Sequence, residues 1–187
     1  MSSPKHILFQ NATLITFNPT TASLEILHNH SLLTTDDRIT AIAPDISPPQ
    51  DADIVDATGK ILSPGLINTH THMWQSAFRS AGPDTTIVEY FARFSQFSPS
   101  ARAFSAEDVY WSALEGYLDA VNAGTTTVVE HAHANWDVEV LGRSYDAAVG
   151  GGARVWWCAA AEEREGVEVS DSCGLVLRLW CIYADAQ

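Results

Sequence analysis

Lysine is almost absent from this sequence. Its 187 residues include only Lys5 and Lys60, and lysine plus arginine number 10 against 23 aspartates and glutamates. The formal net charge is −13 and the sequence pI is near 4.7. Binding to a phosphate backbone depends on clustered lysine and arginine side chains, which this composition does not supply. Nucleic acid is therefore excluded as the main partner, and the negative charge also disfavours anionic ligands.

Cysteine is scarce as well. Cys158, Cys173 and Cys181 make an odd number and show no Cys-x-x-Cys spacing. Such a set predicts neither a disulfide framework nor a cysteine zinc site. We therefore expect buried free thiols, as in a reducing compartment, and a cytoplasmic protein.

Long apolar runs are missing too. No stretch approaches the roughly 18 apolar residues of a membrane span. The most apolar late segment, residues 174–183, is short and carries Arg178. The first six residues lack the uninterrupted apolar segment of a signal peptide. No membrane association is expected, whereas the 46% of hydrophobic residues is typical of a globular protein.

Three common catalytic signatures are also absent. The sequence contains no Gly-x-Ser-x-Gly elbow, no phosphate-binding Gly-Lys-Ser/Thr loop and no dinucleotide fingerprint. Gly150-Gly-Gly152 precedes an expected strand and does not follow one, so we expect it to end a helix. The candidate chemistry has to come from other residues.

Residues 1–60 are expected to form a small antiparallel β-domain. Their apolar and β-branched stretches are short and are separated by turn residues. The acidic pair Asp36-Asp37 falls between two such stretches, which is typical of a hairpin turn. The expected strands are residues 6–17, 23–27, 31–35, 38–43 and 53–56.

From residue 61 onwards, strand and helix signals alternate. Residues 61–68 form an apolar run of the kind found in a sheet buried on both faces. Ser105 begins a capping signal, after which apolar residues recur at helical spacing up to Gly124. The later expected elements are strands at residues 125–129 and 153–158 and a helix at residues 137–149. This order is typical of parallel βα units, so residues 61–187 are expected to form one α/β domain.

Histidine is the residue type with the most informative spacing. The seven histidines include three pairs spaced i, i+2, namely His28/His30, His70/His72 and His131/His133. In a strand, residues i and i+2 project to the same face, so each pair could hold one cation through two imidazoles. His70 and His72 directly follow the apolar run, at the strand edge where parallel α/β folds build their active sites. We expect them to be metal ligands, the alternative being strand-end histidines bonded to the backbone.

The other two pairs have different surroundings. His131 and His133 follow the next expected strand and should lie on the same edge of the sheet. There they could bind substrate, orient a ligand or simply pack. His28 and His30 fall in an expected turn of the β-domain, where solvated side chains are the better interpretation.

Three further residues lie beside these pairs. Trp74 and Gln75 follow the first pair, and an indole and an amide there could bind a flat polar substrate by stacking and hydrogen bonding. The alternative for Trp74 is an aromatic ring that closes the core. Glu130 could support a ligand or form an ion pair, and strand alternation should point it away from the face that Val129 and His131 share.

Two segments carry a resemblance to a known family. Asp56-Ala-Thr-Gly-Lys-Ile-Leu-Ser-Pro-Gly-Leu-Ile-Asn-Thr-His-Thr-His72 resembles the signature of the amidohydrolase superfamily, and is most similar to its aminohydrolase branch of triazine hydrolases and nucleobase-type deaminases. Gly124-Thr-Thr-Thr-Val-Val-Glu-His131 resembles the second barrel strand of that branch. The resemblance covers about residues 6 to 160. It implies an α/β fold: the first three βα units of a partial TIM (β/α)8 barrel at residues 61–187, with part of a small antiparallel β-sandwich at residues 1–60.

The resemblance also implies a chemistry. His70 and His72 would hold a divalent metal, zinc most often and iron sometimes, that activates water and polarises the substrate. The implied reaction is hydrolysis of a non-peptide C–N bond, such as deamination of a cyclic amine or amide. The candidate substrate-binding residues are then Trp74, Gln75, His131 and His133.

The family needs more ligands than this sequence shows. Its members also use histidines from later strands and an aspartate from the eighth, whereas the last histidine here is His133. Residues 64–187 are about half of the roughly 250 that a barrel needs. We therefore expect a truncated barrel, whose open edge favours self-association. Two functions stay open: a metal-dependent C–N hydrolase, and a catalytically silent fragment that acts through assembly with a partner.

Overall fold

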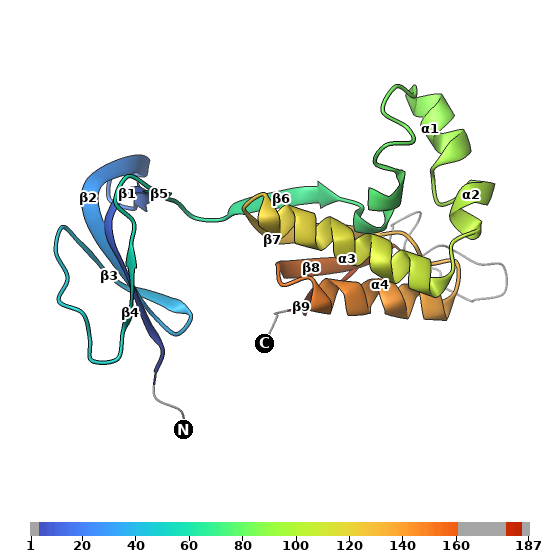
Figure 1. The fold of residues 1–187 in the computed structure, drawn as a ribbon. Coiled ribbons are helices and arrows are strands. Elements are labelled where there is room, and N and C mark those ends of the chain that lie inside the picture. The colour runs from blue at the N-terminus through green and yellow to red at the C-terminus, as the bar shows by residue number, and fades with distance from the viewer. Residues whose placement is uncertain (1–3, 161–178, 185–187) are drawn as a thin grey trace. The chain divides into compact units, whose positions relative to one another are not determined.

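The computed structural model describes residues 4–160 and 179–184 (Figure 1). The chain divides into two compact units, Met1–Pro64 and Gly65–Gln187. This division falls inside the apolar run from which we expected a single strand. Pro64 interrupts that run, because proline has no N–H to donate to a sheet.

The first unit is a sheet built around β1 (His6–Asn18). β2 (Ser23–Thr35) pairs with β1 and with β3 (Arg38–Ala43), both antiparallel. β4 (Asp53–Asp56) and β5 (Ile61–Leu62) pair with β1 in parallel. The prediction of a wholly antiparallel sheet is therefore wrong for β4, and β5 joins this sheet although its residues were expected to begin the strand of the second domain. Alternation identifies a strand, but its direction depends on the connection that returns the chain to β1.

β2 is one long strand where two were expected, and it carries His28 and His30. Asn29, between them, has a φ of 52°, and the register with β1 shifts at this point, as in a β-bulge. The prediction of a turn at these histidines is wrong, because a bulge and a turn favour the same polar residues. His28 is exposed, and the ring Nδ1 of His30 donates to the His28 carbonyl at 2.9 Å.

Other predictions for this unit are confirmed. Asp36 and Asp37 form the turn between β2 and β3, with Thr35 opposite Arg38. β4 has the bounds expected from the sequence. These features depend on residues adjacent in the chain, which explains why they could be predicted.

The second unit has a sheet whose strands β6 (Leu66–Thr71), β7 (Thr125–Ala132) and β8 (Arg154–Ala160) are parallel and lie in that order. α3 (Ala106–Asn122) precedes β7 and α4 (Val138–Gly150) follows it. Figure 1 shows the two helices side by side along one face of the sheet. The predicted alternation of parallel strands and helices is confirmed over these elements. No helix in the described part of the chain is long and apolar enough to cross a membrane.

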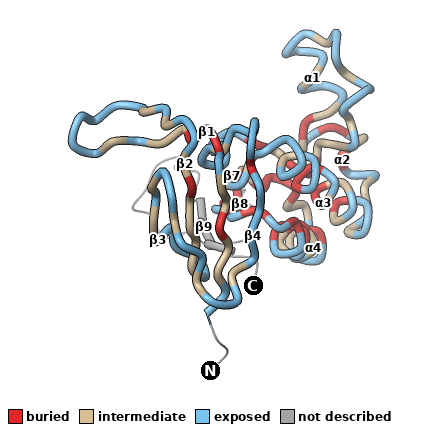
Figure 2. The backbone as a smooth tube through the Cα atoms, turned by 60° about the vertical axis from the view of Figure 1, so that its left-hand side comes forward, coloured by how far each residue is buried: buried red, intermediate tan, exposed pale blue. Residues whose placement is uncertain are grey.

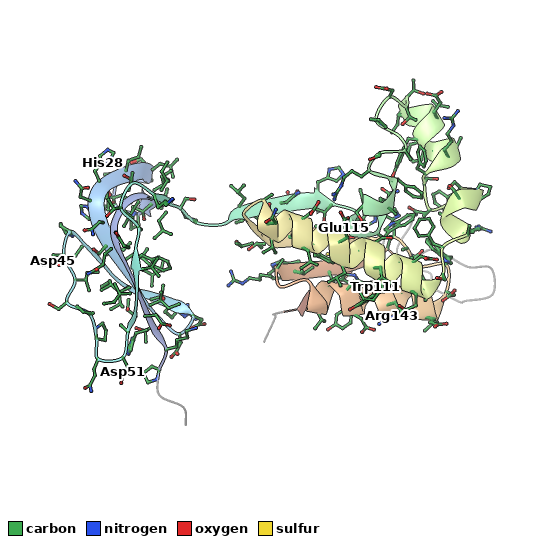
Figure 3. All side chains as sticks on the ribbon, in the orientation of Figure 1. His28, Asp45, Asp51, Trp111, Glu115 and Arg143 are labelled. Atoms are coloured by element: carbon green, nitrogen blue, oxygen red, sulfur yellow. The ribbon has the colours of Figure 1, made fainter. Side chains whose placement is uncertain are left out.

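Both helices begin where the sequence places them. Ser105 Oγ accepts the Asp108 N–H, and the Asp108 carboxylate accepts the Ser105 N–H at 2.9 Å, which is a capping box. Asp137 caps α4 by accepting the Val140 N–H at 2.9 Å. Arg143 of α4, labelled in Figure 3, joins the helices. Its guanidinium lies 2.8 Å from the carboxylate of Glu107 and over the ring of Tyr110, both on α3.

Three short helices between β6 and α3 were not predicted. They are η1 (Met73–Phe78), α1 (Ile87–Arg93) and α2 (Pro99–Arg102). Each is too short to show a helical period in the sequence. Arg79, at the end of η1, forms ion pairs with Glu115 and Asp119 of α3. α1 buries no residue, and Figure 2 shows it as largely exposed.

The core of the second unit lies between the sheet and the two long helices. Figure 2 shows buried residues gathered on α3, α4 and the strands beneath them. The main contributors are Val109, Ala113, Tyr117, Val128, Val140, Ala147, Val155 and Trp157. Strand alternation then turns Val129, His131 and Trp156 to the opposite face of the sheet, where they are half-buried or exposed.

The two edges of this sheet differ. Among residues 4–160 and 179–184, β6 pairs only with β7, and Leu66 and Ile67 on it are 62% and 69% exposed. At the other edge, β9 (Leu179–Ala184) pairs with β8 in antiparallel fashion. The parallel series therefore ends at β8.

Cys158 is disulfide-bonded, so the expectation of a free thiol is wrong for this residue. The register of β8 and β9 places Cys181 opposite Cys158. Spacing along the chain could not show this bond, because it does not show which cysteines meet in the fold. Cys173 lies outside the described residues.

Candidate metal and substrate site

Four histidines meet at the carboxyl ends of β6 and β7. The ring centroid of His72 lies 5.3 Å from that of His70, 5.3 Å from that of His131 and 4.6 Å from that of His133. The rings of His131 and His133 are 5.4 Å apart. The two pairs expected on the same edge of the sheet are therefore neighbours in space.

The geometry of His70 and His72 fits two imidazoles on one cation. A tetrahedral zinc ion with Zn–N bonds of about 2.0–2.1 Å holds two ring centroids about 5 Å apart. His72 Nδ1 lies 3.3 Å from the His131 carbonyl oxygen. Because a carbonyl only accepts, Nδ1 carries the hydrogen and Nε2 keeps its lone pair. Burial lowers the pKa of His72, which favours the neutral ring that a metal requires.

This pair by itself is an incomplete ligand set. Among residues 4–160 and 179–184, no group of three or more His, Cys, Asp or Glu side chains is arranged to hold a metal ion. One nearby atom is left unsatisfied, since His131 Nε2 is buried without a hydrogen-bond partner in the described part of the chain. A buried polar atom without a partner costs free energy, which favours a polar ligand beside His131.

His133 is held in a different way. Its side chain is 3% exposed, and burial, with help from His72 and His131, lowers its pKa to about 3. Trp74 Nε1 donates to His133 Nδ1 at 3.4 Å. The ring is therefore neutral with its hydrogen on Nε2, and its Nδ1 lone pair is already used.

Trp74 lies in the core, not on the surface of the site. It is 1% exposed and packs edge-to-face against Phe78, Phe104 and Trp136. Of the two interpretations of Trp74, the aromatic ring that closes the core matches this placement. Its link to the site is the hydrogen bond to His133.

Gln75 uses both ends of its amide elsewhere. Its Nε2 donates to the Phe94 carbonyl at 2.9 Å, and its Oε1 accepts from the Tyr90 hydroxyl at 2.9 Å. The amide therefore ties η1 to the segment that contains α1. Its amide hydrogen bonds thus go to the α1 segment, although Gln75 and His72 both line one open cavity.

Glu130 is the residue whose role the sequence indicated least clearly. It is 1% exposed and accepts hydrogen bonds from Thr71 Oγ1 at 2.6 Å and from the Met73 N–H at 2.9 Å. Burial raises its pKa to about 7. It points away from the face of His131, as alternation predicted. The same alternation places Thr71, between the two metal-ligand candidates, on the face of Glu130, which is the signal that could have revealed the pair.

Comparison with known sequences gives one family and a consistent set of relatives. Residues 61–180 match the model of the amidohydrolase family. A 5-methylthioadenosine/S-adenosylhomocysteine deaminase from Carboxydothermus hydrogenoformans is 32% identical over 123 residues, covering 65% of this chain and 27% of that protein. A 5'-deoxyadenosine deaminase from Methanosarcina acetivorans is 31% identical over 124 residues, covering 66% of this chain and 27% of that protein. The chain thus spans about a quarter of the length of these relatives.

Solved structures show the same fold. A triazine hydrolase from Arthrobacter aurescens superposes with a TM-score of 0.68 at 23% identity, covering 83% of this chain and 35% of that one. A guanine deaminase from C. acetobutylicum with bound guanine superposes with a TM-score of 0.66 at 18% identity, covering 82% of this chain and 36% of that one. An atrazine chlorohydrolase from Arthrobacter aurescens complexed with zinc superposes with a TM-score of 0.64 at 22% identity, covering 88% of this chain and 38% of that one.

The family match coincides with the site. Residues 61–180 include the three parallel strands, the four clustered histidines and Glu130. They make up more than half of the chain. The resemblance seen in the segment from Asp56 to His72 is thereby confirmed: the chain belongs to the amidohydrolase family.

Proposed function

We propose that this chain carries the metal-binding part of a hydrolase that cleaves a non-peptide C–N bond and deaminates a small cyclic substrate. The observation that carries the proposal is the pairing of His70 and His72 at the carboxyl end of β6, with the His72 lone pair free on Nε2. Zinc is the proposed metal, with iron as the alternative. A structural neighbour complexed with zinc supports this choice.

The residues around the pair have separate tasks in this proposal. A bound divalent metal would supply a Lewis acid and an activated water for attack on the carbon that bears nitrogen. The His131 carbonyl orients the His72 ring through the Nδ1–H. His133, neutral with its hydrogen on Nε2, can donate to an acceptor atom of the substrate. Trp74 acts through His133, and Gln75 through the α1 segment.

The substrate class follows from the relatives and the charge. The relatives named above are deaminases of methylthioadenosine, S-adenosylhomocysteine and deoxyadenosine, and one neighbour binds guanine. All of these carry an amino group on a flat nitrogen heterocycle. With a net charge of −13, a neutral substrate of this kind is favoured over an anionic one.

Substitution of the paired histidines tests the metal site. In metal-free protein titrated with Co²⁺ at pH 7.5, we expect one equivalent to bind, and His70→Asn or His72→Asn to weaken binding at least about a hundredfold, because each removes a ligand directly. Co²⁺ absorption and elemental analysis report the bound metal. Ammonia release from adenosine, guanine and aminotriazine substrates then tests the reaction.

The chain offers a matched control with the same spacing. His28→Asn and His30→Asn alter the His-x-His pair of β2, in the other unit, and should leave cobalt binding unchanged. The metal site would be contradicted if the variants of β2 lost as much cobalt affinity as those of His70 and His72. It would also be contradicted if the unaltered protein took up no cobalt. Metal uptake without ammonia release from any substrate would contradict the enzymatic proposal for this chain.

Assembly with a partner is the second candidate. The observation that favours it is the β6 edge, which is unpaired among the described residues and carries the exposed Leu66 and Ile67. We expect light scattering after size exclusion to give a mass above the 20.3 kDa of one chain. A monomer at all concentrations would contradict this candidate.

A further inference from the structure

We infer that Glu130 is a positioning residue, whose buried carboxylate fixes the end of β6 so that His70 and His72 face one site. We call Glu130, Thr71 and Met73 the Glu130 brace. Its consequence for metal binding rests on the proposed function, whereas its effect on the backbone does not. No atom of the brace needs to touch the metal or the substrate.

The brace holds the residues on both sides of His72, Thr71 through its side chain and Met73 through its main chain. Glu130 Oε2 accepts from Thr71 Oγ1 at 2.6 Å, and Glu130 Oε1 accepts from the Met73 N–H at 2.9 Å. Thr71 Oγ1 also lies 3.1 Å from the Val129 carbonyl oxygen. One side chain of β7 thus binds the residues immediately before and after His72.

The backbone pairing of β6 with β7 is irregular at this point. Asn68 pairs with Val128 and Thr71 with Glu130, so β6 has one residue more than β7 over this stretch. This is the arrangement of a β-bulge, a feature that redirects side chains next to active sites. His70 lies in the bulge, and its N–H donates to Asn68 Oδ1 at 3.1 Å. Because the regular ladder is interrupted here, side chains have to hold the strand end, and the brace closes the bulge.

A carboxylate is a costly choice for a purely structural role. Glu130 is 1% exposed, and none of the ion pairs among the described residues includes it. Burying such a group costs free energy that an apolar side chain would not cost. Its two oxygens, however, each accept from a different donor. A glutamine would offer one oxygen and one NH₂ group, so it could not satisfy both donors in this geometry.

Four variants separate positioning from stability. Glu130→Gln and Thr71→Val each remove one half of the brace, Thr71→Ser keeps the hydroxyl, and Val128→Ala removes core packing two residues before Glu130 on the same buried face. We expect Glu130→Gln and Thr71→Val to weaken Co²⁺ binding by about tenfold or more, and Thr71→Ser to restore it. Val128→Ala should lower the melting temperature and leave the cobalt dissociation constant unchanged. If Glu130→Gln fails to fold, comparison of the cobalt affinities of Thr71→Val and Thr71→Ser still tests the brace.

A second measurement needs no metal. In metal-free protein, we expect hydrogen exchange of the Met73 amide to be faster in Glu130→Gln than in the unaltered protein, with amides of α4 unchanged. Unchanged exchange at Met73 would overturn the brace. The brace would also be overturned if Glu130→Gln and Thr71→Val kept the cobalt affinity of the unaltered protein. The same holds if Val128→Ala lost as much cobalt affinity as they do. Faster exchange in a protein that takes up no cobalt would instead sustain the brace and overturn the proposed function.

Discussion

Below pH 6.5 the buried neutral ring of His133 is expected to cost the second unit stability, and His133→Asn is expected to remove about 2 kcal/mol of the loss between pH 6.5 and 4.5. Burial lowers the pKa of His133 from 6.5 to about 3. Between these values the unfolded chain binds a proton at this residue and the folded chain does not. The contribution of His133 to the unfolding free energy therefore falls as the pH falls, by up to about 1.4 kcal/mol per pH unit.

Urea unfolding in the presence of a chelator measures this effect. All six tryptophans lie in the second unit, so their fluorescence reports on that unit alone. His72 and His131, whose pKa values are also lowered, add slopes of the same sign to both proteins. Glu130 adds an opposite slope, because its raised pKa means that its stabilisation is lost as the pH rises towards 7. These contributions largely cancel in the comparison of the two proteins.

A variant without a titrating group is the control for the acid effect. Val155→Ala removes buried packing in β8 and should lower stability equally at pH 7.5 and 4.5. His133→Asn should instead make the unfolding free energies measured at pH 7.5 and at pH 4.5 more alike than they are in the unaltered protein. Parallel pH profiles for the unaltered protein and His133→Asn would contradict the buried neutral state of His133.

Trp74→Ala is expected to lower the unfolding free energy of the second unit by about 3–5 kcal/mol, the usual cost of deleting a large buried aromatic side chain. Trp74 is 1% exposed and packs against Phe78, Phe104 and Trp136. Its removal leaves a cavity at the centre of these rings. It also leaves His133 Nδ1 without its indole donor.

Trp111→Ala is the matched control for this prediction. Trp111 lies on α3 and is 61% exposed (Figure 3), and surface substitutions of this kind usually change stability by about 0.5 kcal/mol or less. Each variant removes one tryptophan, so the fluorescence signals are comparable. Similar losses of unfolding free energy in Trp74→Ala and Trp111→Ala would contradict the core placement of Trp74. They would favour the other interpretation offered by the sequence, a stacking surface for substrate.

The helices illustrate how far the sequence could be read. The Ser105 cap was predicted because it binds an N–H three residues away, and the bounds of α3 and α4 were close to those expected from the apolar spacing. The short helices between β6 and α3 were missed, since none is long enough to show a period. The predicted direction of β4 was wrong, because strand direction depends on the path of the connecting loop.

The site divides along the same line. His70 and His72 were recognised from their spacing and their position after an apolar run, and their role as metal ligands stays a prediction. Glu130 could be assigned a direction but no partner, because Thr71 lies 59 residues away in the chain. The disulfide at Cys158 was missed as well, because spacing along the chain does not show which cysteines meet.

The sequence by itself determined the family, the Ser105 helix cap and the edge of the sheet that carries the histidines. These follow from residues close together in the chain, where propensity and alternation act directly. Only the tertiary structure decided that Trp74 belongs to the core, that Gln75 binds the α1 segment and that Glu130 braces the bulge beside His70. Each of these outcomes is a competition between partners from distant segments, and packing of the sheet against its helices selects the one that is satisfied.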